Sequence, residues 1–361
     1  MAKAQKAKIH KSPGSQGPDE LVTSVVDYNL GSIFHLLSEN TINVSPGYQR
    51  RFRWDEKQQS LLIESFLLNI PVPPIYLSET DEGQYYVIDG QQRLTAIKRF
   101  FSGDLKLEEL EIRAECNGLR FAELANADAR KLQNRSSVRA IIILQQSHDE
   151  IRLKVFQRLN SGTEKLNSQE IRNSTFPGTL NERLLQLSVH PQFSHMIGTD
   201  KDRDNKTAYK NMRDVEFVLR FFTFCDRWEG FSNLMSANMD RFMSENRNAD
   251  AATLDNLEKR FLKATEIADA AFGEYAFRRW WPNKNRWDRA VMSALYDAVI
   301  LACQSFEPKT VRAHREAILV GYQSLFERSD FLQSIEKATH WPPSVCYRVR
   351  AVKGVIAEAL R

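Results

Sequence analysis

One short segment, Asp89-Gly90-Gln91-Gln92-Arg93, combines the side chains best suited to chemistry. A guanidinium group beside the first amides of a helix suits a phosphate group. The carboxylate of Asp89 could hold a metal ion, a ribose hydroxyl or an attacking water. The structural alternative is that Asp89 caps the following helix and Arg93 forms a surface ion pair. Residue types alone leave both interpretations open.

The residues around this segment predict a strand, a tight turn and a helix. Residues 85–88 are strand-forming, and Leu94, Ile97 and Phe100 recur at helical spacing. Gly90 would let the backbone turn between the two elements, so that the first amides of the helix point outwards. The turn is therefore predicted to offer a place for an anion.

Arginines interleaved with aromatic residues precede this turn. Residues 47–54 contain Arg50, Arg51 and Arg53 among Tyr, Phe and Trp. In an extended chain the aromatic side chains could anchor a strip that presents guanidinium groups, whose fork matches phosphate oxygens. The alternative is a loop in which the aromatic side chains pack and the arginines are solvated.

The string IDGQQRLTAI at residues 88–97 resembles the signature of the domain of unknown function 262 family. Two further segments are similar to that family in the same order, namely YQRRFRW at 48–54 and FQRLNSG at 156–162 with EIRN at 170–173. The resemblance spans roughly residues 28–230. The family includes the N-terminal halves of GmrSD-type restriction systems, and its members resemble ParB and sulfiredoxin in fold.

This resemblance implies a nucleotide site, because relatives are thought to bind and hydrolyse nucleoside triphosphates at the DGQQR turn. Gly90 and the amides beside it would cradle phosphate, and Arg93 would neutralise charge that develops in phosphoryl transfer. Asp89 would hold Mg²⁺ directly or through water. Gln91 or Gln92 would orient the attacking water. We therefore expect catalytic roles for Asp89, Gln91, Gln92 and Arg93.

The same resemblance extends the expected nucleotide- and phosphate-binding residues beyond the turn. Two of them have structural alternatives: Asn160 could cap a helix, and Arg172 could form an interhelical ion pair with its neighbours. The additional expected residues are Gln49, Arg50, Arg53, Asn160 and Arg172.

The chain has 361 residues, of which 42% are hydrophobic and 27% charged, enough for about two domains with cores of their own. It contains no apolar run of about 20 residues and no apolar signal-peptide core, so we expect no membrane span and a cytoplasmic location. The four cysteines are too scattered for a CxxC zinc site or a disulfide framework. The net charge of +4 permits a nucleic-acid partner without requiring one.

We expect an α+β fold with three parts. Residues 1–23 are predicted to form a flexible basic tail, residues 24–176 a ParB/sulfiredoxin-like α/β domain, and residues 177–361 an all-helical domain. A helix is predicted over Arg289–Cys303, and solvated charge is the default expectation for Arg220. The cations and tryptophans of residues 278–287 suit either nucleic-acid binding or a helix–helix corner.

Inspection excludes several enzyme classes. The chain has no P-loop, GxGxxG turn, HExxH motif or GxSxG elbow, and nothing after residue 230 resembles an HNH nuclease domain. The leading hypothesis is a Mg²⁺-dependent nucleoside triphosphatase in a bacterial DNA-related or phage-defence, restriction-like system. The alternatives are a DNA or modified-DNA binding module, a ParB-like nuclease, and a partner subunit of a separate nuclease. The helical domain could then mediate docking or homodimer formation.

Overall fold

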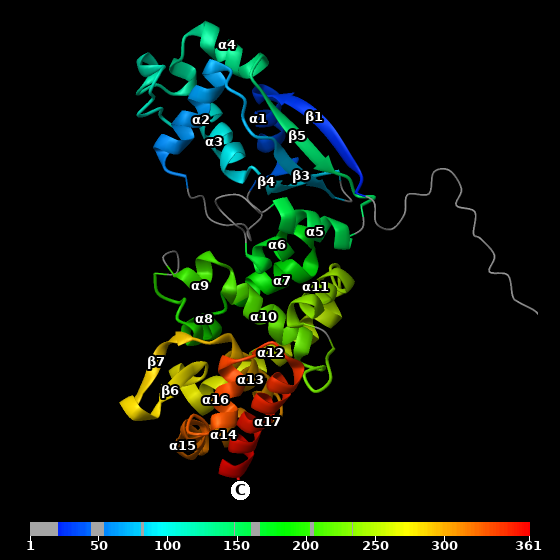
Figure 1. Ribbon diagram of the computed structural model, residues 1–361, viewed down its shortest axis with the longest axis vertical. Coiled ribbons are helices and arrows are strands. Elements are labelled where there is room, and N and C mark those ends of the chain that lie inside the picture. The colour runs from blue at the N-terminus through cyan, green and yellow to red at the C-terminus, as the bar shows by residue number, and fades with distance from the viewer. Residues whose placement is uncertain are drawn as a thin grey trace, which may run out of the picture. The chain divides into compact units, whose positions relative to one another are not determined.

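The computed structural model describes residues 21–44, 54–80, 83–147, 149–159, 167–202, 206–232 and 234–361, which Figure 1 shows as ribbons. The described residues up to 159 form one compact unit, and those from 167 onwards form a second. The division thus comes before the predicted boundary at 176. The reason is that helix α6 (Ser168–Thr175) contacts helix α10 (Arg213–Phe224) of the second unit.

The first unit is a mixed α and β structure, as predicted. A five-stranded sheet has the strand order β1-β5-β3-β4-β2, with antiparallel β1/β5 and β3/β4 pairs and parallel β3/β5 and β2/β4 pairs. Its elements are β1 (Thr23–Asn29), α1 (Leu30–Ser38), β2 (Ile42–Asn43), α2 (Glu56–Leu68), β3 (Ile75–Glu79), β4 (Tyr85–Asp89), α3 (Gln91–Phe101), α4 (Asn126–Asn134), β5 (Ser137–Ile143) and α5 (Asp149–Leu159).

Helix α3 lies at the centre of the first unit's core. It packs against α1 and α2, which in turn contact α4. The apolar residues that predicted this helix, Leu94, Ile97 and Phe100, are fully buried. Burial of such side chains fixes the rotation of α3, and with it the position of the residues at its first turn.

Helix α2 begins at a complete capping box formed by Asp55 and Gln58. The Gln58 amide donates to Asp55 Oδ1 at 2.7 Å, and the Asp55 amide donates to Gln58 Oε1 at 3.2 Å. We expect Asp55→Ala to lower the free energy of unfolding of the first unit by about 1 kcal/mol, because the Gln58 amide at the helix end loses its acceptor. Urea unfolding with hydrogen exchange across α2 measures the loss. Asp55→Ser keeps an acceptor and should retain most of the stability; equal losses for both variants would contradict the capping role.

The second unit is mainly helical, but the prediction that it is entirely helical is wrong. Strands β6 and β7 form an antiparallel hairpin, and β7 occupies the start of the helix predicted over Arg289–Cys303. The elements after α6 are α7 (Thr179–Ser188), α8 (Pro191–Ile197), α9 (Thr207–Lys210), α10, α11 (Met235–Glu245), α12 (Ala251–Phe272), β6 (Arg278–Trp281), β7 (Arg286–Val291), α13 (Ser293–Cys303), α14 (Pro308–Ala313), α15 (Arg315–Leu325), α16 (Ser329–Glu336) and α17 (Pro342–Ala359).

A buried charge network joins three helices of this unit. Arg220 on α10 donates to both carboxylate oxygens of Asp297 on α13, at 2.8 and 2.7 Å, and Arg348 on α17 donates to the same carboxylate at 3.1 Å. All three side chains are at most 3% exposed. Burial acts to lower the pKa of Arg220, but the carboxylates of Asp297 and Glu216 raise it above its usual value. The expectation of a solvated Arg220 is therefore wrong.

No described helix is both long enough and apolar enough to cross a membrane.

Candidate nucleotide site at the Gly90 turn

The predicted strand, turn and helix are all present around Gly90. Strand β4 ends at Asp89, Gly90 adopts the left-handed conformation with φ 98° and ψ 12°, and α3 begins at Gln91. Gly90 leaves this helix without a side-chain N-cap. The start of an uncapped helix carries unsatisfied amides and the positive end of the helix dipole. The turn therefore has the electrostatic character that an anion requires.

Space as well as backbone conformation requires glycine at position 90. A Cβ atom placed there would lie 2.5 Å from Ile75 Cγ2 and 3.2 Å from one terminal nitrogen of Arg93. Ile75 belongs to β3, the neighbour of β4 in the sheet. Strand β3 thus packs directly under the turn, and the backbone at Gly90 remains uncovered by a side chain of its own.

Arg93 is held at the turn by two hydrogen bonds. Its guanidinium donates to Asp89 Oδ2 at 2.7 Å and to the carbonyl oxygen of Pro73 at 2.9 Å. The Arg93 side chain is 11% exposed, whereas that of Asp89 is 53% exposed. The ion pair that the structural alternative predicted is present, but Asp89 does not cap the helix. The result is a positioned cation beside the helix start and a carboxylate that reaches solvent.

Gln91 and Gln92 connect the helix start to two distant parts of the chain. Gln91 Nε2 donates to the carbonyl oxygen of Val44 at 2.8 Å, and Gln92 Oε1 accepts from the Trp54 amide at 3.2 Å. Val44 and Trp54 flank residues 45–53 in the sequence, which include the predicted ligands Gln49, Arg50 and Arg53. The first two residues of α3 therefore fix both ends of the segment that contains those arginines.

The structure does not place several of the predicted site residues at the Gly90 turn. Gln49, Arg50, Arg53 and Asn160 lie outside the described residues. Arg172 belongs to the second unit, where its buried guanidinium donates to Asp240 Oδ1 at 2.7 Å and to Ser236 Oγ at 2.6 Å. This is the interhelical ion pair of the structural alternative, between α6 and α11. We therefore leave Arg172 out of the proposed site.

Asp89 is compatible with Mg²⁺ as an accessory ligand. Mg²⁺ usually keeps several waters and binds proteins through one or two carboxylates together with substrate phosphates. The half-exposed carboxylate of Asp89 meets this requirement, although Arg93 already occupies one of its oxygens. Within the described part of the chain, no group of three or more His, Cys, Asp or Glu side chains is arranged to hold a metal. The Mg²⁺ assignment stays a prediction.

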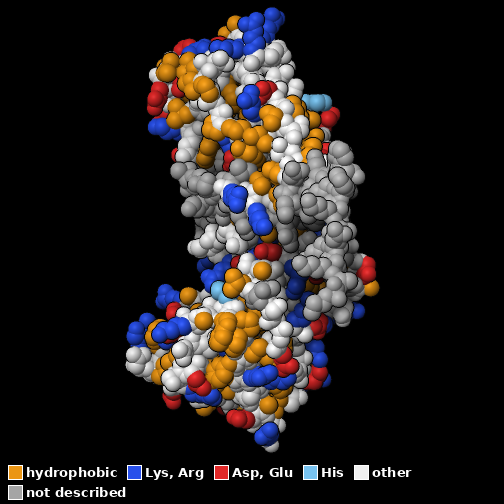
Figure 2. Space-filling view, turned by 45° about the vertical axis from the view of Figure 1, so that its right-hand side comes forward, with side chains coloured by type: hydrophobic (Ala, Val, Ile, Leu, Met, Phe, Trp, Pro, Cys, Tyr) orange, Lys and Arg blue, Asp and Glu red, His pale blue; other side chains and the backbone are white. Residues whose placement is uncertain are grey.

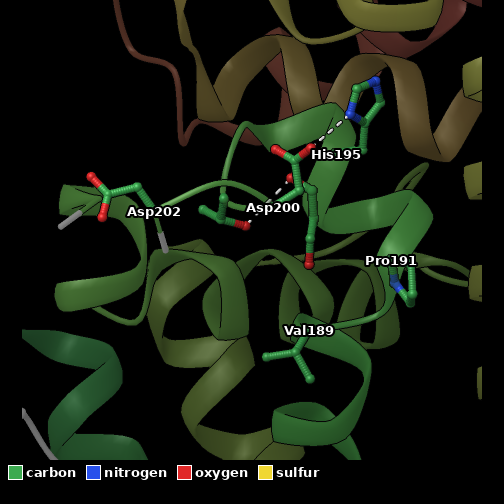
Figure 3. Close-up of a pocket in the computed structure, with 7 residues that line it drawn as sticks. Val189, Pro191, His195, Asp200 and Asp202 are labelled. Atoms are coloured by element: carbon green, nitrogen blue, oxygen red, sulfur yellow. Dashed lines mark hydrogen bonds and ion pairs between the residues drawn. The ribbon is translucent and has the colours of Figure 1, made fainter. Parts of the chain in front are cut away.

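The second unit contains a separate hollow that the sequence analysis missed. It has a volume of about 620 Å³ and lies around α8 and the loop after it (Figure 3). His195 Nδ1 lies 2.9 Å from Asp200 Oδ2, and the hydrogen bond from His195 lowers the pKa of Asp200. His195 and Asp200 stand five residues apart, on either side of the end of α8. This spacing is the signal in the sequence from which the pair could have been found. Its lining residues are Val189, Pro191, Ser194, His195, Thr199, Asp200 and Asp202.

Comparison with known proteins gives one informative match. Residues 33–177 match the family model described as GmrSD restriction endonuclease, N-terminal domain. Comparisons with curated proteins and with solved structures found no match. The matched range includes the Gly90 turn, Arg93 and both glutamines. It supports the predicted GmrSD-type N-terminal domain, while the ParB/sulfiredoxin-like fold stays a prediction.

Proposed function

We propose that the first unit binds a nucleoside triphosphate at the Gly90 turn and hydrolyses it, as part of a restriction-like phage-defence system. The observation that supports this most strongly is the position of Arg93. Its guanidinium is fixed by Asp89 and Pro73 beside a helix start that has no side-chain cap. The match of residues 33–177 to a restriction endonuclease domain supports the biological setting.

Phosphate binding would use the backbone as well as Arg93. The start of α3 has no side-chain cap, and the helix dipole favours negative charge there. Arg93 would add charge-assisted hydrogen bonds that strengthen as negative charge develops on the transferred phosphoryl group. Its existing hydrogen bonds restrict its rotamers before the ligand arrives, which reduces the entropy lost on binding.

Hydrolysis would require a positioned water and charge neutralisation. The side chain of Gln91 or Gln92 would orient the water whose oxygen attacks the γ-phosphorus while the bond to the leaving diphosphate oxygen breaks. Asp89 would hold Mg²⁺ through its exposed oxygen, and the bound ion would neutralise charge on the β- and γ-phosphates. These roles use each group where the turn already places it.

The arginines before Trp54 are proposed as further phosphate ligands. Arg53 directly precedes Trp54, whose amide donates to Gln92, and Arg50 belongs to the same short segment. The segment also begins next to Val44, which Gln91 holds. This connectivity supports Arg50 and Arg53 as ligands, and family resemblance supports Gln49 and Asn160.

Calorimetric titration with ATP, GTP, CTP and UTP, each with Mg²⁺, tests the proposal. We expect at least one to bind with micromolar affinity and to release phosphate. Arg93→Ala should weaken that binding roughly 10- to 150-fold, because a hydrogen bond to a charged group contributes about 1.5–3 kcal/mol. Arg130→Ala removes an exposed cation from α4 of the same unit and serves as the control.

Two results would contradict the proposal. If the unaltered protein binds none of the four nucleotides, the site is not a nucleotide site. If Arg93→Ala and Arg130→Ala bind as the unaltered protein does, the nucleotide binds elsewhere. Circular dichroism of both variants checks that the fold is retained, and Arg93→Lys separates charge from the guanidinium fork, with an intermediate affinity expected.

A further inference from the structure

The β6–β7 hairpin combines an aromatic base with an unusual concentration of cations. Residues 278–291 contain five basic residues and one acidic residue. Trp280 lies opposite Trp287 in the strand register, and the turn between the strands includes a short 3-10 helix, Pro282–Lys284. The hairpin lies at the lower left of Figure 1. Figure 2 shows Lys and Arg side chains on the corresponding part of the surface.

Stacked aromatic rings fix this hairpin to the helical body of the second unit. Trp287 stacks on Tyr275 with ring centroids 5.0 Å apart and on Tyr322 at 5.8 Å, and Trp280 lies 5.2 Å from Trp287. Tyr322 is fully buried, and its hydroxyl donates to the Ala276 carbonyl. These ring contacts hold the two-stranded hairpin against the helices, and Trp280 and Trp287 both take part in that packing.

Two of the hairpin arginines are also used internally. Arg278 donates to the carbonyl oxygens of Met196 and Glu274, and burial lowers its pKa. Arg279 donates to Glu336 at 2.5 Å, and its guanidinium lies 3.9 Å from the ring centroid of Trp281. These contacts place both arginines in the attachment of the hairpin.

The remaining three cations, Lys284, Arg286 and Arg289, are exposed. None of them has an ion pair with another described residue at 4.0 Å or less. The one acidic residue of the hairpin, Asp288, accepts a hydrogen bond from the Arg289 amide at 2.7 Å. The outer part of the hairpin therefore carries a cluster of positive charge, while the packed aromatic rings hold its base in place.

We propose that the β6–β7 hairpin contacts the sugar-phosphate backbone of duplex DNA through Lys284, Arg286 and Arg289. A two-stranded ribbon fits the major groove of B-form DNA, which is about 12 Å wide. Arg286 and Arg289 lie at most about 10 Å apart along β7, because three residues of extended strand span that distance and the register shift between Trp287 and Val291 shortens it. Separate phosphates can therefore pair with separate cations.

The same geometry favours duplex DNA over other nucleic acids. Proteins that bind single strands stack bases on accessible aromatic rings. Here Trp280 and Trp287 pack within the hairpin base, and Arg279 and Lys284 lie over Trp281. Duplex RNA presents a deep and narrow major groove that a ribbon does not enter. This proposal concerns the second unit and does not depend on nucleotide binding at Gly90.

Fluorescence anisotropy with a labelled duplex of about 20 base pairs, titrated from about 50 to 200 mM NaCl, tests the hairpin. The test variant combines Lys284→Gln, Arg286→Gln and Arg289→Gln. We expect it to bind at least about tenfold more weakly at the lowest salt. We also expect the slope of log K against log salt to become less steep by about 2–3, because each lost phosphate contact contributes about 0.9. A control variant, Lys259→Gln with Lys309→Gln and Arg312→Gln, removes three exposed cations from α12 and α14. It should keep the affinity and slope of the unaltered protein.

Three outcomes would overturn the proposal. They are no DNA binding by the unaltered protein at low salt, equal weakening by the hairpin and control variants, and tighter binding of single-stranded DNA or duplex RNA than of duplex DNA. Nucleotide titration of the hairpin variant should give the affinity of the unaltered protein, which separates this result from any failure of the proposed site at Gly90.

Discussion

Replacing Asp297 with alanine is expected to lower the free energy of unfolding of the second unit by about 3–5 kcal/mol. The variant leaves Arg220 and Arg348 buried without the carboxylate that both contact at 2.7–3.1 Å. Arg348 depends strongly on this partner, because burial lowers its pKa and its guanidinium otherwise donates to the neutral carbonyl oxygen of Ser334. Urea unfolding followed by circular dichroism measures the loss, and hydrogen exchange assigns it to α10, α13 and α17.

A surface ion pair of the same unit provides the control for Asp297. Asp226 accepts two hydrogen bonds from Arg260, but its side chain is 68% exposed. Asp226→Ala should cost less than about 1 kcal/mol, because water replaces the lost partner. Equal losses for the two variants would contradict the explanation by burial. Replacing Arg220, Asp297 and Arg348 together with Met, Leu and Met should recover much of the stability, since no buried charge then remains unpaired.

Gly90→Ala is expected to destabilise the first unit by roughly 2–5 kcal/mol. The left-handed backbone costs a residue with a Cβ atom about 1–2 kcal/mol, and forcing an extra methyl group into a packed region costs about 1–3 kcal/mol. The second contribution arises because the new atom would lie 2.5 Å from Ile75 Cγ2. Urea unfolding with hydrogen exchange across β4 and α3 measures the effect. Nucleotide binding should be lost as well, because the turn must shift.

A second glycine, Gly103, allows the backbone and packing contributions to the Gly90→Ala effect to be measured separately. It also has a left-handed φ, of 79°, but a Cβ atom placed there meets nothing within 4 Å. Gly103→Ala should therefore show the backbone cost alone, about 1–2 kcal/mol, with nucleotide binding unchanged. If both variants lose the same stability, or if Gly90→Ala binds nucleotide normally, close packing under the turn is not what requires glycine.

Local signals in the sequence predicted the elements that position the candidate site. The spacing of Leu94, Ile97 and Phe100 predicted α3, and the glycine predicted the turn, because each effect depends on residues within one or two helical turns. These predictions are confirmed. The partner of Arg93 was not predicted, since the alternative in which Arg93 forms an ion pair gave Asp89 the role of helix cap.

Contacts between distant residues explain what the sequence did not predict. The β6–β7 hairpin depends on Trp287 stacking with Tyr322, and Arg220 is buried because Asp297 and Arg348 converge on it from other helices. Helical periodicity carries no information about such partners, which is why it predicts a helix that begins at Arg289 and why Arg220 is expected to be solvated. The contacts of Gln91 and Gln92 with Val44 and Trp54 were unpredictable for the same reason.

The two glutamines at the start of α3 have a consequence for how this protein could diversify. Gln91 and Gln92 hold Val44 and Trp54, the described residues on either side of positions 45–53, so the start of α3 sets the two points between which that stretch must run. Loop-closure entropy rises only slowly with length, by about 0.6 kcal/mol for each doubling. Sequences of different length are therefore expected to be tolerated between Val44 and Trp54 while the backbone of the Gly90 turn stays unchanged. The length of this stretch and the backbone of the turn can thus vary independently of each other.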